Sequence, residues 1–368
     1  MVNTRALDLE ERIKSLDFFR GLTMFLLIAE FTFLFDRLTD PILEGSWIYD
    51  LGMQFHHHPW HGLRFWDLIQ PFFMFIVGVA IPFSIGNRIK RGHSSIAIRN
   101  HVFRRALLLL FFGWALYCIS PGHIVFRFQN VLAQLSVTFL LAYLVMNLSV
   151  RSQLLFSFAL IIITEIIYRT FSVEGFNHPF VPNENFGTWL DLQYGGADLN
   201  DSWVSFNAIP TTAHTIWGVL TGQLLRSNRP DTKKLKILII AGLIGVIIGY
   251  GLDPFTPIIK RICTSSFILV SGGWTILTLA LSYWLIDMKG WNKGVMFFVI
   301  VGMNPLFIYL FAHVGGADFI SEIVRPFTSS VLGWTGELST TIITSLITLY
   351  LLWYLTYWLY KRRIFIKI

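Results

Sequence analysis

Long apolar stretches recur along the whole chain, and they constrain its fold more than any other feature. A helix needs about 20 apolar residues to cross the hydrocarbon core of a bilayer, because each residue advances it by about 1.5 Å. The stretches predict ten membrane-spanning helices, at residues 17–36, 66–86, 106–121, 130–149, 152–170, 206–225, 235–252, 264–286, 295–315 and 338–360. With 54% hydrophobic and 14% charged residues, the composition also lies outside the usual soluble range. We therefore expect an all-α, polytopic protein embedded in a lipid bilayer.

Basic residues are concentrated in alternate connecting segments. Segments 1–16, 87–105 and 226–236 carry most of them, together with the end of the chain. Because cytoplasmic loops are enriched in Lys and Arg, this bias predicts that both termini face the cytoplasm. The first 16 residues are polar and mixed in charge, so no cleavable signal is expected. The chain is predicted to be a multi-pass protein of the inner, or plasma, membrane. Its net charge of +7 alone would suggest a nucleic-acid partner, but in a membrane protein the distribution of charge matters more than its sum, so no such partner is expected.

The predicted domain organisation is simple. Residues 1–368 are expected to form a single transmembrane domain with one larger external loop, at 171–203. That loop has no Lys or Arg, but it contains Trp189, Tyr194 and several acids. Aromatic rings stack on sugar faces and carboxylates attract ammonium groups, so the loop suits a sugar or an amine. A solvated loop whose acids only keep it soluble is the other interpretation.

The sequence FHHHPWHGLRFWDLIQPFF, residues 55–73, places three adjacent histidines at the start of the second apolar stretch. Imidazole is the side chain whose ordinary pKa lies closest to neutrality, so a histidine here can act as a general base or nucleophile. Asp67 lies in the predicted first helical turn. It can orient a histidine, or simply interact with the helix dipole.

Two other interpretations of these histidines remain open. They can be interfacial residues satisfied by water, with Trp60 and Trp66 forming part of an aromatic belt. His57 and His61 are also four residues apart, the spacing of two metal ligands on one helical face. Since no HExxH or third-ligand pattern accompanies them, no metal is expected.

Further polar residues interrupt the apolar stretches. Asp17 and Arg20 are three residues apart and are predicted to form an ion pair near the cytoplasmic end of the first helix. Asn304 precedes Pro305, where a broken helix would leave backbone groups for polar side chains to satisfy. The remaining buried candidates are Glu30, His214 and His313.

Six segments together resemble one protein family. In chain order they are RIKSLDFFRGLTMF, HHHPWHGLRFWDLIQPFFMFIVGVAIPFSI, QNVLAQLSVTFLLAYLV, IPTTAHTIWGVLTGQLL, GMNPLFIYLFAHV and YWLYKRRIFIKI. They resemble the transmembrane acetyltransferases related to heparan-α-glucosaminide N-acetyltransferase, and most closely the bacterial members linked to N-acetylglucosamine use. The combination of SLDxxRG with HxxWxGxxxxDLIxPxFxFIxGxxI makes the resemblance specific, and it covers nearly the full chain.

The resemblance implies an activity and a set of site residues. A cytoplasmic acetyl-CoA donor would deliver its acetyl group through the helix bundle to the amine of glucosamine, or of an amino-sugar glycan, on the far side. The essential histidine of the family falls on His57, and its aspartate on Asp67. His58 and Trp60 adjoin this histidine and are candidate substrate contacts. Members resemble homodimers, so a homodimer is a possible assembly.

The same resemblance suggests further substrate-binding residues. Asn304 matches the asparagine of its GMN motif, and His313 matches a histidine nine residues later. Both are candidate contacts to the carbonyl group or the sugar.

Coenzyme A carries several phosphate charges, so its binding needs cations. Residues 87–105 supply Arg104 and Arg105, and residues 226–236 supply more. Asp17 and Arg20 match the DxxRG motif of the family and complete the candidate coenzyme-binding set. The topological bias of basic residues also explains the number of these cations.

The chain departs from the family pattern at two places. A Gln-Arg pair of the family is Ala133-Gln134 here, and of an acidic DPEG element only Asp201 remains, followed by Trp203 and Val204. Two other functions therefore stay open. One is an amino-sugar transporter that uses the intramembrane charges, and the other is an O-acetyltransferase of envelope glycans.

Overall fold

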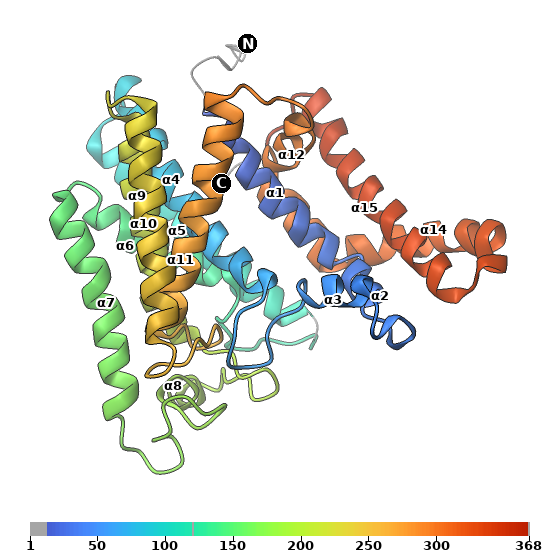
Figure 1. Cartoon of the computed structure of the whole chain (residues 1–368), viewed down its shortest axis with the longest axis horizontal. Helices are drawn as coiled ribbons and strands as arrows, with labels where there is room; N and C mark the ends of the chain where they lie inside the picture. The colour runs from blue at the N-terminus through green and yellow to red at the C-terminus, as the bar shows by residue number, and fades with distance from the viewer. Residues whose placement is uncertain (1–12, 120, 367–368) are drawn as a thin grey trace.

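The computed structural model describes residues 13–119 and 121–366 and is built from helices (Figure 1). In chain order they are α1 (Lys14–Glu30), α2 (Leu34–Leu38), α3 (Trp47–Met53), α4 (Ile69–Lys90), α5 (Ser95–Ile119), α6 (Val131–Val145), α7 (Val150–Thr170), α8 (Phe186–Gln193), α9 (Ala208–Arg226), α10 (Asp231–Leu252), α11 (Ser265–Ser282), α12 (Val295–Gly302), α13 (Pro305–Phe311), α14 (Ala317–Leu332) and α15 (Glu337–Lys361). The described residues contain no strand, only a single bridge between His61 and Ile259. The predicted all-α fold is confirmed.

Within residues 13–119 and 121–366, seven helical stretches are long and apolar enough to cross a membrane. They are Phe65–Lys90, Ser95–Ile119, Val150–Thr170, Asp231–Leu252, Ser265–Met288, Pro305–Thr335 and Glu337–Lys361. This supports a multi-pass membrane protein. The other predicted spans correspond to α1 and α6, which are shorter, and to α9, which is less apolar. Seven of the ten predicted spans therefore meet this criterion of helix length and apolar composition.

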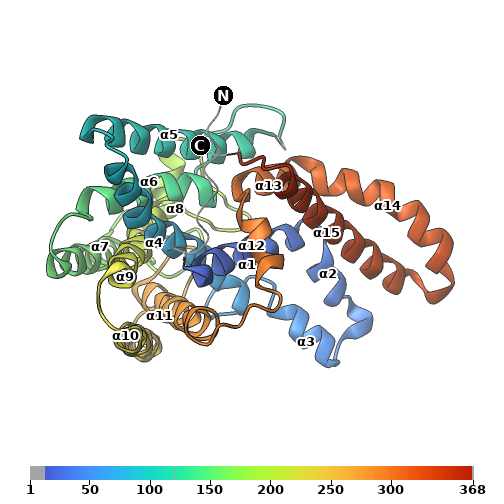
Figure 2. The same cartoon turned by 90° about the horizontal axis from the view of Figure 1, so that it is seen from above.

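Helix α9 lies in the centre of the bundle, packed against α4, α6 and α7. Most of its side chains are buried, including several threonines and His214. Thr211 and Thr212 donate their hydroxyl hydrogens to backbone carbonyls one turn earlier, which satisfies these polar groups away from water. Because neighbouring helices shield α9 from lipid, it does not need the apolar surface that α7 and α10 present on the outside (Figure 2).

The helices α4 and α9 approach each other backbone to backbone. A Cβ atom at Gly78 would collide with the carbonyl of Thr215, and one at Gly218 would collide with the carbonyl of Phe75. Small residues permit this close contact, which is a common way for membrane helices to pack. The contact fixes α4, which carries much of the candidate site, against the centre of the bundle.

The predicted span at 295–315 is not one helix. The chain leaves helical geometry at Asn304, where α12 ends and α13 begins with Pro305 as its first residue. Proline has no amide hydrogen and clashes with the carbonyl four residues earlier, so it starts a new helix here rather than continuing α12. The structure also adds α14, which the sequence placed in a connection between spans.

Three connections gather at one end of the bundle, the lower end in Figure 1. They are residues 54–64, 194–204 and 253–264. The links between α4 and α5 and between α9 and α10 lie at the opposite end (Figure 1). The first end is called the outer end below, and the second the inner end.

Candidate functional site

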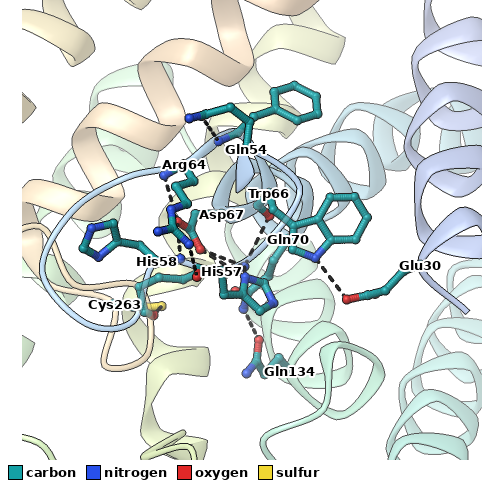
Figure 3. A network of polar contacts seen from close by, with 12 residues as sticks. Glu30, Gln54, His57, His58, Arg64, Trp66, Asp67, Gln70, Gln134 and Cys263 are labelled. Atoms are coloured by element: carbon teal, nitrogen blue, oxygen red, sulfur yellow. Dashed lines mark hydrogen bonds and ion pairs between the residues drawn. The ribbon is translucent and has the colours of Figure 1, made fainter. Parts of the chain in front are cut away.

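His57 and Asp67 meet at the outer end, as the sequence predicts (Figure 3). Asp67 lies in a 3₁₀ turn, Phe65–Leu68, that leads into α4, and His57 lies in the loop before it. Asp67 Oδ1 is 3.0 Å from His57 Nδ1. Its Oδ2 accepts backbone N–H bonds from Arg64 at 2.9 Å and His58 at 3.2 Å. These donors stabilise the ionised carboxylate, whose side chain is only 1% exposed, and they fix its direction.

Lys260 is the third member of this group, which we call the His57 cluster. Its Nζ lies 3.0 Å from His57 Nδ1, 3.7 Å from Asp67 Oδ1 and 3.5 Å from the carbonyl oxygen of Trp66. The Lys260 side chain is 7% exposed. A carboxylate, an imidazole and an amine thus share one buried space, with the imidazole ring as the most exposed part.

The surroundings favour the neutral form of His57. The pKa of His57 is lowered to about 4, because burial and the nearby Lys260 together outweigh the opposing effect of Asp67. Burial also lowers the pKa of Lys260 from its ordinary value, against the attraction of Asp67. A neutral imidazole whose Nδ1–H points to Asp67 leaves a lone pair on Nε2. The side chain of His57 is 34% exposed, the largest exposed fraction of the three side chains in the cluster.

The side chain of Trp203 packs beside the His57 cluster. Its ring lies edge to face with the His57 ring at 5.4 Å between centroids. Lys260 Nζ lies 5.5 Å from the centre of the Trp203 ring, and the Arg261 guanidinium lies 5.6 Å from it. These distances are within the range of cation–π interactions. The Trp203 side chain therefore contacts both the His57 imidazole and two cations.

The buried carboxylate of Asp191 anchors the segment that carries Trp203. Asp191 accepts hydrogen bonds from the side chain of Gln129 at 2.8 Å and from the backbone N–H of Ser205 at 2.9 Å, and from the Tyr194 hydroxyl. These bonds tie residues 194–205 to the loop before α6. The predicted external loop is thus a folded structure built around one acid, and Trp189 packs against Phe186 inside it.

A second feature lies within the bundle. A cavity of about 560 Å³ is bounded by α1, α4, α5, α6, the α12–α13 break and the end of the chain. Its basic lining residues are Arg20, Arg88, His101 and Arg105, and most of the others are apolar. We call it the arginine cavity. Arg88 lies 2.9 Å from His101, while the buried Nε of Arg105 has no hydrogen-bond partner. Asp17 and Arg20 form the predicted ion pair, at 3.3 Å.

Two glutamines lie on α4 and α6 close to the His57 cluster (Figure 3). Gln70 donates to the side-chain oxygen of Gln134, and Gln134 donates to the backbone carbonyl of Gln129 at 2.8 Å. Gln134 stands where the family pattern described above has an arginine. Trp66 donates from its indole nitrogen to Glu30 at 3.1 Å, which gives this α1 carboxylate a partner. The two hydrogen-bonded glutamine amides thus stand where the family pattern would place an arginine charge.

The segment that carries both features also carries a family signature. A family model described as "Heparan-alpha-glucosaminide N-acetyltransferase, catalytic" matches residues 12–251, more than half of the 368 residues. The chain belongs to this family. The match includes His57, Asp67, Trp203 and the arginines of the cavity, whereas Lys260 lies beyond it.

Two curated proteins of the same name are similar to the chain. Heparan-alpha-glucosaminide N-acetyltransferase of Homo sapiens is 25% identical over 365 residues, which covers 82% of this chain and 53% of that protein. The protein of that name from Mus musculus is 29% identical over 133 residues, which covers 35% of this chain and 18% of that protein. The chain therefore spans about half the length of the human relative.

The substrate-binding candidates near His57 have defined contacts. The His58 backbone binds Asp67, while its buried Nδ1 has no partner. Trp60 donates from its indole nitrogen to the carbonyl of Phe180 at 2.7 Å, so it joins the histidine loop to the external loop. His61 lies in the same loop rather than on a helix shared with His57, and it bonds Asp253 at 2.8 Å.

The more distant candidates lie elsewhere in the bundle. The amide of Asn304 donates to the carbonyl of Ile364 at 2.9 Å and accepts from the backbone N–H of Ile366 at 2.8 Å. Because Ile366 lines the arginine cavity, Asn304 belongs to that side of the bundle. His313 is exposed and contacts the rings of Phe31 and Tyr309. Arg104 is exposed and does not line the cavity, whereas Arg105 does.

Sequence analysis missed Lys260, Asp191 and the role of Trp203. One signal was present for Lys260, because basic residues are rare in the segments predicted to be external. The bias of basic residues towards the cytoplasmic side does not explain a lysine in an external segment. Such a lysine is therefore a candidate for a specific contact with another side chain. No comparable signal marked Asp191, which looked like one of several loop acids.

Proposed function

We propose that the protein is a membrane acetyltransferase that moves an acetyl group from cytoplasmic acetyl-CoA to the amine of glucosamine, or of an amino-sugar glycan, on the external side. The observation that carries this proposal is the contact between the His57 imidazole and the buried Asp67 carboxylate, at the outer end of a bundle that also contains the arginine cavity. Membership of the acetyltransferase family supports it. The proposal treats the chain as one transmembrane catalytic domain with an external loop around 171–203.

The proposed topology has ten spans with both termini in the cytoplasm of an inner, or plasma, membrane. Adding α1, α6 and α9 to the seven long stretches gives ten. An even number of spans returns the chain to its starting side. Basic residues are concentrated in the links at the inner end, as expected for a cytoplasmic face. We also propose that the chain can assemble as a homodimer, as the resemblance implies.

His57 would supply the acid–base chemistry. With Nδ1–H donated to Asp67, the Nε2 lone pair would accept a proton from the acceptor amine as its nitrogen bonds to the acetyl carbon. The carbon–sulfur bond of the thioester breaks, and the proton held on Nε2 passes to the departing thiolate. The same lone pair could instead attack the acetyl carbon to give an acetylated His57, and both routes need a neutral ring.

The arginine cavity would hold the donor. Its α4 lining runs from Arg88 to Phe73, which is about 22 Å along a helix of 1.5 Å rise per residue. Phe73 is six residues beyond Asp67 in the sequence, so the lining approaches the His57 cluster from the inner end. Arg20, Arg88 and Arg105 suit the phosphates of coenzyme A, and the apolar remainder suits its less polar arm.

One observation favours a second candidate function, O-acetylation of an envelope glycan. The family pattern has acids where this chain has Trp203, and that ring faces the cations of Lys260 and Arg261. Two cations beside His57 disfavour an approaching ammonium group but not a neutral hydroxyl. An ester product would be labile to alkali, whereas an amide product would not.

The decisive experiment follows free thiol release from acetyl-CoA by the purified full chain, with and without glucosamine and short amino-sugar oligomers. We expect acetamide formation that requires the acceptor and is lost in His57→Ala. The matched control is His56→Ala, because the His56 side chain bonds Thr39 instead of Asp67. An alkali-labile product would favour O-acetylation. Failure of every acceptor, combined with sugar counterflow without acetyl-CoA, would replace the proposal with transport.

A further inference from the structure

The Nδ1 atom of His57 has two close partners, but it can form a hydrogen bond with only one of them, either as a donor or as an acceptor. Asp67 Oδ1 and Lys260 Nζ each lie 3.0 Å from it. If Nδ1 carries a hydrogen, the bond goes to Asp67 and Lys260 cannot donate to the same atom. If Nδ1 is bare, Lys260 donates to it and the hydrogen moves to Nε2. Only the first arrangement leaves Nε2 able to accept a proton.

We propose that Lys260 is a positioning residue that keeps His57 uncharged and thereby keeps its outer nitrogen available as a base or nucleophile. An ionised Asp67, a neutral His57 and a protonated Lys260 together carry no net charge, which is the least costly state to bury. A proton added to His57 would place a second positive charge 3.0 Å from the ammonium group of Lys260.

The contacts of Lys260 hold it in this role. Its Nζ has a carboxylate at 3.7 Å, a carbonyl oxygen of Trp66 at 3.5 Å and the face of the Trp203 ring at 5.5 Å. With three of its surroundings able to stabilise a cation, the ammonium group does not need His57 as an acceptor. It can therefore act on the imidazole through charge while Asp67 takes the Nδ1 hydrogen.

The charged groups that face His57 or its loop are Asp67 from the turn before α4, Arg64 from the loop, and Lys260 and Arg261 from residues 253–264. The Arg64 guanidinium donates to the backbone carbonyl of His57 at 3.0 Å rather than to its ring. Glu30 on α1 attracts Lys260 and helps to hold it charged. Among the described residues, Lys260 is the cation for which a direct contact with the imidazole is recorded.

This inference rests on the proposed function only for its consequence in catalysis. When Nε2 takes the proton of the acceptor, the imidazolium and Lys260 repel each other, so the proton is readily passed to the thiolate and the neutral ring returns. The effect of Lys260 on the ring itself does not depend on which reaction follows.

The first test compares Lys260→Met with the wild-type full chain across pH. The protonation of an amine acceptor also lowers the rate in acid, so the measured quantity is the ratio of variant to wild-type kcat/KM at each pH. Without the cation, Asp67 dominates and the pKa of His57 rises by about 1 to 3 pH units. We expect a ratio that is steady in base and falls towards acid by up to about tenfold per pH unit below the raised pKa. A ratio that is reduced equally at every pH would mean a purely structural role and would overturn the proposal.

The second test reads His57 without using activity. Diethyl pyrocarbonate acylates neutral imidazole, and peptide mass spectrometry of the intact protein after labelling reports each histidine separately. We expect the pH at which His57 loses half of its reactivity to lie about 1 to 3 pH units higher in Lys260→Met than in the wild type. The exposed His178 normalises the amount of reagent in each sample. Identical pH profiles for His57 in both proteins would overturn the proposal even if all turnover assays fail.

Matched variants complete the design. Lys289→Met removes another lysine that lies over a tryptophan ring, at the inner end, and should leave the His57 profile unchanged. Lys260→Arg keeps the charge and should keep His57 reactive in acid. Lys260→Gln retains donors for the Trp66 carbonyl and replaces Lys260→Met if that variant does not fold. If Lys260→Arg moved the profile as far as the neutral variants, charge would not be the cause and the proposal would fail.

Discussion

The His57 cluster and the arginine cavity organise charge in opposite ways. In the cluster, the carboxylate of Asp67 has several donors within 3.2 Å and the amine of Lys260 is almost fully buried. The cavity measures about 560 Å³, and the buried Nε of Arg105 in its wall has no partner. A site whose polar groups already satisfy one another suits chemistry on a small group, because its geometry is set before the substrate arrives. A roomy site with unused donors suits recognition of a large anion.

Asp67→Asn should have the largest effect, because it removes the carboxylate at the centre of the His57 cluster. The amide cannot hold the Nδ1–H tautomer of His57 in the same way, and it leaves Lys260 buried without a carboxylate. We expect kcat to fall by about 10²- to 10⁴-fold, with little change in the KM for acetyl-CoA. The measurement is steady-state kinetics with the acceptor at saturation.

Asp253→Asn is the matched control, because Asp253 pairs with His61 of the same loop instead of His57. It should retain most of its activity. Equal losses in both variants would show that the loop needs its acids only for folding.

Arg105→Gln tests whether the arginine cavity binds the acetyl-CoA donor. The loss of a charged donor to a phosphate costs about 1.5 to 3 kcal/mol, so we expect the KM for acetyl-CoA to rise by about 10- to 100-fold with the acceptor KM unchanged. The neighbouring Arg104→Gln is the control, since Arg104 is exposed and lies outside the cavity lining. A larger effect at Arg104 would place the donor outside the arginine cavity.

Trp203→Phe should give the smallest effect. It tests whether the Trp203 ring contributes to acceptor binding beside the His57 cluster. Phenylalanine keeps an aromatic wall but weakens the interactions with Lys260 and Arg261. At about 0.5 to 1 kcal/mol for such an interaction, we expect a two- to fivefold rise in the KM for the acceptor. The donor KM is measured in parallel, and a change confined to the donor would contradict an outer role for this ring.

The parts of the site that could be predicted from the sequence are local in the chain. His57 and Asp67 are ten residues apart across one tight loop, and Asp17 and Arg20 share a helical face. Lys260 is 203 residues from His57, so only the packing of the bundle brings them together. Arg104 and Arg105 are adjacent residues of the same type, so the sequence does not distinguish them. Only the orientation of α5 about its axis determines that Arg105 lines the cavity and Arg104 does not.

The same limit applies to the helices. Apolar length predicted α4, α7, α10 and α15 to within about four residues at each end, because these helices must match the bilayer. It missed α14 and joined α12 to α13, since apolar composition continues through the break at Asn304. Local backbone chemistry decides that break, and hydropathy does not report it.

The polar interior of α9 has a consequence for biosynthesis. A segment with this many threonines, a histidine and modest apolar character is a poor candidate to enter a bilayer on its own. Helix α4 is made earlier and offers the glycine surface on which α9 docks. Insertion of α9 would then depend on α4 already being in place. A bulky substitution at Gly78 should therefore appear first as a protein that the cell fails to insert and degrades, before any purified enzyme exists to be assayed.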